Sequence, residues 1–243
     1  MSDPIRSIEE LSLNAWPSLQ TIYYDGWVLR FAKCYTRRAN SINPIYPSSV
    51  KLIEKIQHCE KVYASVDQPA IFKVTPSIGA LDKLLAEQGY REDARTSVQT
   101  LNLDGLAAPR TDCVTLSGEL TDSWLDAYCR LNDVNPQHLP TMTRLLENII
   151  PAHCFLTLQH GGEAAAVGLA VAEREYVGLF DIVIAAPLRR LGLGTELILH
   201  LLRWGKANGA QQGYLQVMCN NAPALRLYAK LGFAEIYQYW YRI

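Results

Sequence analysis

A cluster of arginines and glycines in the C-terminal half of the chain has the residue types that bind phosphate groups. Glycine allows a tight backbone turn and leaves the neighbouring amide groups open to an anion. Arginine adds positive charge and hydrogen-bond donors from the side, and the first N–H groups of a following helix would point to the same place. The residues concerned are Arg189, Arg190, Leu191, Gly192, Leu193, Gly194 and Thr195.

The elements on either side of this cluster must position it. Ile182, Val183 and Ile184 are β-branched and are followed by Pro187, so they predict a buried strand. The segment from Thr195 to Lys206 has apolar residues at helical spacing. A strand, a glycine turn and a helix in this order suit a pyrophosphate group. An ordinary turn with arginines on a solvated face is the alternative.

A second segment, from Asn221 to Phe233, reads NAPALRLYAKLGF and follows a short apolar strand at Tyr214 to Val217. Together with the Arg-x-x-Gly-x-Gly turn, this string resembles the GCN5-related N-acetyltransferase superfamily over about residues 111–243. The resemblance implies an α/β (α+β) fold with a mixed, mostly antiparallel central sheet flanked by helices. It also implies acetyl-coenzyme A as the acyl donor, no metal, and transfer of the acetyl group to an amine.

The resemblance assigns roles to the residues of both segments. The backbone of Ile182–Ile184 would hold the acyl-thioester chain where two strands separate, and Arg189–Thr195 would bind the pyrophosphate. Asn221 would order the loop and the donor, although it also suits a helix N-cap. Tyr228 would contact the donor and protonate the departing thiolate, with a packed aromatic ring as the alternative.

The position of the usual general base is where this chain departs from the family pattern. An alkylammonium with a pKa near ~10 is about one part in a thousand neutral at pH 7, so its deprotonation costs roughly 4 kcal/mol without help. Many relatives carry a glutamate on the strand before the asparagine, where this chain has Gln216, an amide that cannot take a proton. Asp181 interrupts the apolar run GLFDIVI and is the candidate base. A carboxylate satisfied by backbone donors or facing solvent is the alternative.

The N-terminal half repeats the pattern in a weaker form. Setting Gly89 against Gly232 gives a constant offset of 143 residues, which brings IFKV onto YLQV and LDKLLAEQGY onto ALRLYAKLGF. The turn before Val50 reads NPIYPSS and lacks Gly-x-Gly, so we expect a degenerate copy that has lost coenzyme A binding. The domains would be residues 1–106 and 111–243, joined through Leu103–Pro109. A chance likeness between two small α/β segments is the alternative.

Apolar periodicity also predicts the individual elements. In the N-terminal half we expect strands at Trp27–Phe31, Tyr35–Ile45 and Ala70–Thr75 and helices at Val50–Glu60 and Ile78–Gln88. In the C-terminal half we expect helices at Thr121–Val134 and Gln137–Ile149, a hairpin of Phe155–Gln159 with Ala164–Glu173, and strands at Tyr176–Ile184 and Tyr237–Ile243.

Composition limits the surroundings in which the protein works. Lys plus Arg number 23 and Asp plus Glu 24, for a formal charge of -1, so nothing draws the whole molecule to nucleic acid or an anionic membrane. The six scattered cysteines form no C-x-x-C pair and are expected to be buried and reduced. The N-terminus lacks a signal-peptide pattern and no long apolar run occurs, so a cytoplasmic location is expected.

The leading interpretation is an acetyl-coenzyme A-dependent N-acetyltransferase. Its acceptor would be a small primary amine or amino acid that attacks the thioester directly, and the protein would act as a monomer or homodimer. A protein or peptide N-acetyltransferase and a non-catalytic coenzyme A-binding interaction module are the alternatives. The intact Tyr228 and the Arg189–Gly194 turn favour the enzyme.

Overall fold

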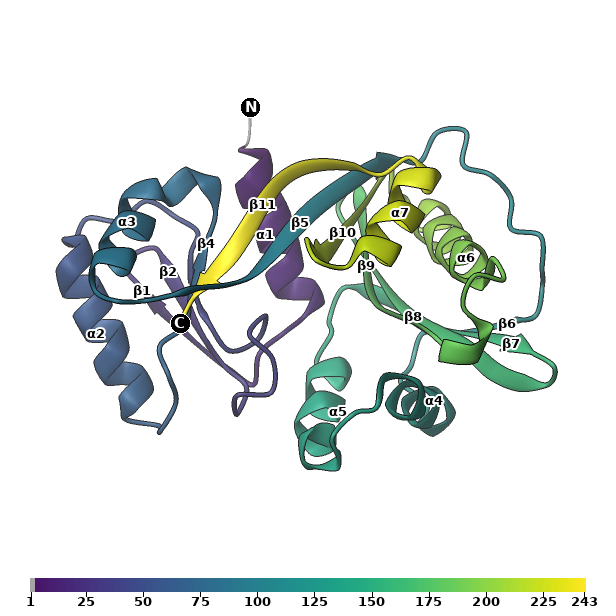
Figure 1. Ribbon diagram of the computed structural model, residues 1–243, viewed down its shortest axis with the longest axis horizontal. Helices are drawn as coiled ribbons and strands as arrows, with labels where there is room; N and C mark the ends of the chain where they lie inside the picture. Colours follow the sequence, from purple (N-terminus) through teal and green to yellow (C-terminus); the bar gives the residue numbers. More distant parts are fainter. Residues whose placement is uncertain (1–2) are drawn as a thin grey trace. The chain divides into compact units, whose positions relative to one another are not determined.

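The structure is a computed structural model that describes residues 3–243, and these form two compact units. The first unit contains residues up to Val98 together with Met218–Asn220 and Ile236–Ile243. The second contains Gln99–Val217 and Asn221–Glu235. The C-terminal segment of the chain therefore belongs to the unit that is otherwise built from its N-terminal part. Figure 1 shows the elements of both units coloured along the sequence.

The first unit is a sheet with helices. In chain order its elements are α1 (Pro4–Ala15), β1 (Gln20–Tyr24), β2 (Trp27–Phe31), β3 (Ile42–Pro44), α2 (Leu52–Ala64), β4 (Phe72–Val74), a 3-10 turn (Pro76–Ile78) and α3 (Gly79–Glu87), with most of β5 (Glu92–Asn102) and of β11 (Ala234–Arg242). The strands lie in the order β1-β2-β3-β4-β11-β5. The β1/β2, β2/β3 and β4/β11 pairs are antiparallel. β3 and β4 are parallel and are joined through α2.

The core of the first unit forms because α2 presents one apolar face. Ile56, Cys59 and Tyr63 recur at helical spacing and are all fully buried. The Tyr63 hydroxyl donates a hydrogen bond of 2.8 Å to the carbonyl oxygen of Arg30 on β2. Packing and this buried hydrogen bond together fix α2 against the sheet.

The strand predicted over Tyr35–Ile45 is wrong for most of its length. Only Ile42–Pro44 forms a strand, β3. The chain turns before it, with Lys33 and Cys34 in the left-handed region at φ of 49° and 57°. The Asn40 Oδ1 accepts hydrogen bonds from two backbone amides in this turn, including that of Cys34 at 3.1 Å. A local side-chain acceptor of this kind competes with strand pairing.

The second unit contains the elements that carry the two motifs. In chain order they are β6 (Val114–Ser117), α4 (Asp122–Asn132), a 3-10 turn (Pro136–His138), α5 (Leu139–Glu147), β7 (Ala152–His160), β8 (Glu163–Glu173), β9 (Tyr176–Ile184), a 3-10 turn (Ala186–Leu188), α6 (Leu193–Ala207), β10 (Gln212–Met218) and α7 (Ala222–Leu231). The strand order is β5-β10-β9-β8-β7-β6. β6 to β9 form an antiparallel run, whereas β9 and β10 are parallel. The expected mixed, mostly antiparallel sheet flanked by helices is therefore confirmed.

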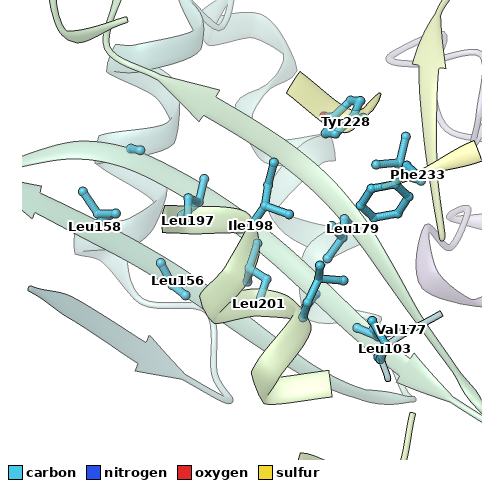
Figure 2. Packing of buried hydrophobic residues seen from close by; sticks show 14 of the residues in the cluster. Leu103, Leu156, Leu158, Val177, Leu179, Leu197, Ile198, Leu201, Tyr228 and Phe233 are labelled. Carbon is cyan, nitrogen blue, oxygen red and sulfur yellow. The ribbon is translucent and has the colours of Figure 1, made fainter. Parts of the chain in front are cut away.

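Helix α6 packs closely on this sheet, and α4 packs on its other side (Figure 1). Figure 2 shows Leu197, Ile198 and Leu201 of α6 lying over apolar side chains of the strands. Gly205 brings the helix close to β9, because a Cβ there would lie 2.5 Å from the Cβ of Val177. This contact sets the position of α6, whose first turn carries the glycine motif.

The cysteines differ from the expectation that all are buried. Cys59 and Cys154 are buried, and burial raises the pKa of the Cys154 thiol to about 11. Cys34 and Cys113 are exposed, and Cys129 and Cys219 are partly exposed. Cys34 and Cys219 lie in turns, Cys113 lies in the loop just before β6, and Cys129 lies in α4. Within the described part of the chain, no helix has both the length and the apolar character needed to cross a membrane.

Candidate active site

Strands β9 and β10 run side by side and separate before either strand ends. Their paired register ends where Leu215 lies opposite Leu179. β9 continues to Ile184, and β10 continues to Met218. Beyond the last pair, the backbone groups on the β10 side of β9 face a gap between the strands. Backbone N–H and C=O groups in such a gap are available to a ligand or to water, and contact of Ile182–Ile184 with the acyl arm stays a prediction.

A β-bulge in β9 lies beside this gap. The register between β8 and β9 shifts between Val167 and Leu169, and Asp181 adopts a φ of 50°, which is uncommon for a residue with a Cβ. Gly168 of β8 makes room for the bulge, because a Cβ there would lie 2.9 Å from the Ile182 Cδ1. Because of the bulge, the Asp181 side chain does not take part in the apolar packing of the Ile182 side chain.

The Asp181 carboxylate is held by helix α4. The Tyr128 hydroxyl donates a hydrogen bond of 3.1 Å to the Oδ1 of Asp181, and the Asn132 Nδ2 donates one of 3.0 Å to the Tyr128 oxygen. The Tyr128 ring is stacked on that of Trp124, with centroids 5.2 Å apart. Sequence reasoning did not find Tyr128 or Asn132, since only the apolar period of α4 was visible and not the strand it would meet.

The glycine turn forms the N-terminus of α6. Gly192 is the N-cap of the helix at φ 86°, and Arg190 is also left-handed at φ 69°. A Cβ on Gly192 would meet no atom within 4 Å, so the space beside the turn is open. Among residues 3–243, none accepts a hydrogen bond from the amides of Gly192, Leu193 or Gly194. These amides and the partial positive charge of the helix end can receive an anion.

Three segments meet at this turn. A Cβ on Gly194 would lie 3.0 Å from the Leu227 Cδ2 of α7 and 3.4 Å from the Ile184 Cδ1 at the end of β9. The Arg189 Nε donates a hydrogen bond of 3.4 Å to the Ile184 carbonyl oxygen. Arg189 and Arg190 are exposed beside the open amides. The predicted strand, turn and second motif helix are thus in contact.

The two named residues of the second motif have structural roles in α7. The Asn221 Oδ1 accepts a hydrogen bond of 3.3 Å from the Ala224 amide, so Asn221 caps the helix as one of its two predicted roles required. Tyr228 is 8% exposed and meets the ring of Phe233 edge-on at 5.9 Å. Figure 2 shows this pair at one end of the apolar cluster. Contact of either residue with the donor stays a prediction.

Gln216 lies where the resemblance places the usual base. It is the residue of β10 directly after the last pair with β9, and it is partly exposed. An amide at this position can donate and accept hydrogen bonds but cannot take up a proton. Asp181 lies in β9 two residues beyond the last pair with β10, and its role as the base stays a prediction.

Comparison with known proteins identifies the family. A family model described as the C-terminal region of the probable histone acetyltransferase Rv0428c matches residues 2–242. The chain belongs to this family of GCN5-related N-acetyltransferases. The protein is thus an acyltransferase enzyme.

Individual relatives agree with this assignment. An uncharacterized N-acetyltransferase of Bacillus subtilis (strain 168), YobR, is 29% identical over 248 residues, which cover 99% of each protein. A GCN5-related N-acetyltransferase from Kribbella flavida has a TM-score of 0.73 at 14% identity, over 100% of this chain and 96% of that one. A tandem GNAT protein from the clavulanic acid biosynthesis pathway has a TM-score of 0.61 at 16% identity, over 83% of this chain and 74% of that one.

GCN5-related N-acetyltransferases use acetyl-coenzyme A as acyl donor, and the residues of this acetyltransferase fit it. The open amides of Gly192–Gly194 and the two arginines would suit its pyrophosphate, and the gap beside β9 would offer backbone groups to its extended acyl arm. Across the described residues, no group of three or more His, Cys, Asp or Glu side chains is placed to hold a metal ion.

Proposed function

We propose that this acetyltransferase moves the acetyl group of acetyl-coenzyme A to the primary amine of a small molecule or amino acid. The observation that carries the proposal is the half-buried Asp181 carboxylate at the bulge where β9 and β10 diverge. A carboxylate there attracts an ammonium group and belongs to the strand, β9, that would hold the acyl arm. Asp181 is the base in this proposal.

An ammonium nitrogen has no lone pair, so the acceptor first releases one proton to solvent and then attacks as the neutral amine. A second proton must leave the nitrogen as its bond to the carbonyl carbon forms. The nitrogen becomes far more acidic during this step, so a carboxylate can accept the proton although a free alkylammonium has a pKa near ~10. Tyr128 and Asn132 keep the Asp181 carboxylate oriented through their hydrogen bonds. This orientation limits the motion of the base while the amine attacks.

Polarisation of the carbonyl and departure of the thiol require two further groups. Backbone N–H groups between Ile182 and Ile184 would hydrogen-bond the acyl arm in the gap, and donors aimed at developing negative charge lower the barrier. We assign protonation of the leaving sulfur to the Tyr228 hydroxyl. The position of Tyr228 in α7, next to Leu227 that packs on the glycine turn, supports this assignment.

The acceptor must carry its amine on a slender group. Asp181 is only partly exposed, so an amine reaches it at the end of a small molecule or of a free amino acid. A protein N-terminus or lysine side chain meets the same requirement and is the second candidate acceptor. The name of the family, that of a probable histone acetyltransferase, favours that candidate.

The first unit is, in this proposal, a degenerate copy of the second. Under the offset of 143 residues, α3 falls on 222–230 and matches α7, and the last residue of α2 falls on the last residue of α6. β4 falls on 215–217, within β10. Both units also join two parallel strands through a helix. The tandem GNAT protein among the solved structures supports the same arrangement.

A cytoplasmic location is part of the proposal. All six cysteines are free, and Cys34 and Cys113 are exposed. Exposed thiols persist in reducing compartments and are oxidised outside them.

Calorimetric titration with acetyl-coenzyme A, followed by thiol release over a panel of acceptors, tests the proposal. The panel contains alkylamines, amino acids, peptides with a free N-terminus and peptides with an internal lysine. We expect one donor bound per chain and turnover of an alkylamine or amino acid. Turnover of peptides alone would establish the second candidate acceptor, and donor binding without turnover of any amine would reject an enzymatic role for Asp181.

A further inference from the structure

The turn between β1 and β2 holds a carboxylate at the start of helix α2. The two Asp25 carboxylate oxygens accept hydrogen bonds of 3.0 Å each from the Ser49 amide, and the Oδ2 accepts one of 2.9 Å from the Val50 amide. The Ser49 hydroxyl donates a further bond of 2.9 Å to the Oδ1. Helix α2 begins just beyond, at Leu52. The carboxylate thus binds the amides of the two loop residues directly before the N-cap of α2, Lys51, and lies beside the helix start, whose partial positive charge favours an anion.

A buried lysine on α2 is the counter-charge of this carboxylate. The Lys55 side chain is 0% exposed, and its Nζ lies 3.0 Å from the Asp25 Oδ2 and also donates to the Asp25 carbonyl oxygen. The same nitrogen lies 4.2 Å from the centre of the Trp27 ring. A buried ammonium group requires a partner of opposite charge. Asp25 and Lys55 therefore form an internal ion pair that is complete without a ligand.

Glycine lets this turn approach the loop before α2. Gly26 has a φ of 81°, and a Cβ on it would collide with the Pro47 carbonyl oxygen and lie 2.6 Å from that of Tyr46. Any other residue would push the β1–β2 turn away from the loop. Asp25 thus supplies the carboxylate, and Gly26 allows the β1–β2 turn to approach the loop before α2 closely enough for the contact.

By position in the sequence, the amides that hold Asp25 correspond to those of the glycine turn, although α2 begins two residues later than α6 under this offset. The offset of 143 residues places Ser49 on Gly192 and Val50 on Leu193. In the second unit, the equivalent amides have no acceptor among the described residues. Lys55 falls on Ile198, a fully buried member of the apolar core. The first unit thus has an internal anion and cation where the second has open amides and an apolar side chain.

We propose that the Asp25 carboxylate takes the place of the donor's pyrophosphate in the first unit, so that the chain binds coenzyme A at one site only. This inference rests on the proposed origin of the first unit as a copy of the second. The loop NPIYPSS lacks the Gly-x-Gly of the binding turn, and Asp25 fills the space that remains in front of its amides. The Asp25 carboxylate thus neutralises the partial positive charge at the start of α2 in place of the lost ligand.

Thermal unfolding of three variants, with and without inorganic phosphate at constant ionic strength, tests the proposal. Asp25→Ala removes the internal anion and leaves Lys55 without its counter-charge, so its unfolding midpoint falls by several degrees. Phosphate then raises the midpoint of Asp25→Ala by more than it raises that of the wild type. Asp25→Asn keeps the size of the side chain, so its unfolding midpoint falls by less than that of Asp25→Ala. It provides a folded variant if Asp25→Ala does not fold.

Glu54→Ala is the matched control, since Glu54 is an exposed acid in the first turn of the same helix. Its response to phosphate equals that of the wild type. An equal response of all three variants and the wild type would overturn the proposal, as would two molecules of coenzyme A bound per wild-type chain. Failure of the acetyltransferase function would appear as lack of donor binding or turnover in the wild type, and it would leave the phosphate response of Asp25→Ala unchanged.

Discussion

The hydroxyl of Tyr128 on α4 lies 3.1 Å from the Asp181 carboxylate on β9 and donates a hydrogen bond to it. Tyr128 is itself fixed by stacking on Trp124 and by the amide of Asn132. A helix on one side of the sheet thereby orients a carboxylate that lies at a bulge in the motif strand. This relationship connects the fold of the second unit with the base of the proposed reaction.

Tyr128→Phe removes only the hydroxyl of this contact. We expect kcat/KM for the amine to fall about tenfold, as for loss of one hydrogen bond to a charged group, while the affinity for coenzyme A is unchanged. Steady-state kinetics with the two substrates varied separately measures the difference. Tyr176→Phe, a tyrosine at the other end of β9, is the control and keeps full activity. Equal losses in both variants would show a general effect on the sheet.

Asp181→Asn removes the charge and the proton acceptor but keeps the shape of the side chain. A general base contributes about a hundredfold or more, so we expect kcat to fall by at least that factor. The affinity for coenzyme A, measured by calorimetry, stays the same because its proposed contacts are elsewhere. Wild-type turnover in this variant would remove Asp181 from the mechanism.

Tyr228→Phe keeps the packing against Phe233 and removes the proposed acid. We expect a loss of about a hundredfold in kcat with coenzyme A binding retained. The loss shrinks for an acyl donor whose thiol is more acidic, because such a thiol leaves without a proton. Comparison of two thioesters in wild type and variant measures this. An equal loss for both donors would contradict a role for Tyr228 in departure of the thiol.

Alanine substitutions of two glycines at opposite ends of α6 distinguish the effect of backbone strain from the effect of weaker ligand binding. Gly192 and Gly209 have φ of 86° and 93°, and a Cβ on either would meet no atom within 4 Å. Alanine at either position therefore costs about 1 kcal/mol of stability through the left-handed backbone alone. We expect only Gly192→Ala to weaken coenzyme A binding in calorimetry. Equal affinities of the two variants would contradict the placement of the pyrophosphate at the start of α6.

We expect the stability of the first unit to depend on pH through Asp25. Hydrogen bonds from the amides of Val50 and then Ser49 hold the pKa of this carboxyl below its usual value. A carboxyl of this kind stabilises the fold at pH above about 4, and its contribution is lost as the pH falls toward the folded-state pKa. We expect the unfolding midpoint of Asp25→Asn to fall less steeply below about pH 4 than that of the wild type. A Glu54→Gln control follows the wild-type profile, and a parallel profile for Asp25→Asn would contradict the prediction.

The sequence predicted the elements that carry the motifs more closely than the rest of the fold. The strand at Tyr176–Ile184 is β9, and the helix behind the glycine turn is α6, because apolar periodicity and glycine act locally. β5 (Glu92–Asn102) was not predicted, since EDARTSVQTLN has little apolar alternation and its pairing is long-range. The strand predicted over Tyr35–Ile45 was wrong because the Asn40 side chain stabilises a turn instead.

The candidate site, like the fold, was predicted only in part from the sequence. The turn at Arg189–Gly194 was predicted because the spacing of its residues in the chain is itself the signal, and its binding of an anion stays a prediction. The bulge that gives Asp181 its left-handed backbone depends on Gly168 of the neighbouring strand, and the contact with Tyr128 depends on how α4 packs on the sheet. Neither follows from any single segment, so sequence reasoning found the carboxylate but not what orients it.

Strand β11 has a consequence for the order in which the protein forms during synthesis. Residues 236–243 belong to the first unit, although all of the second unit's residues precede them in the chain. The Tyr237 hydroxyl donates a hydrogen bond of 2.8 Å to Glu9, which also pairs with Lys73. The first unit therefore remains without one of its central strands on the ribosome until translation has passed the second unit. The part of the protein that is made first is the last that can be completed.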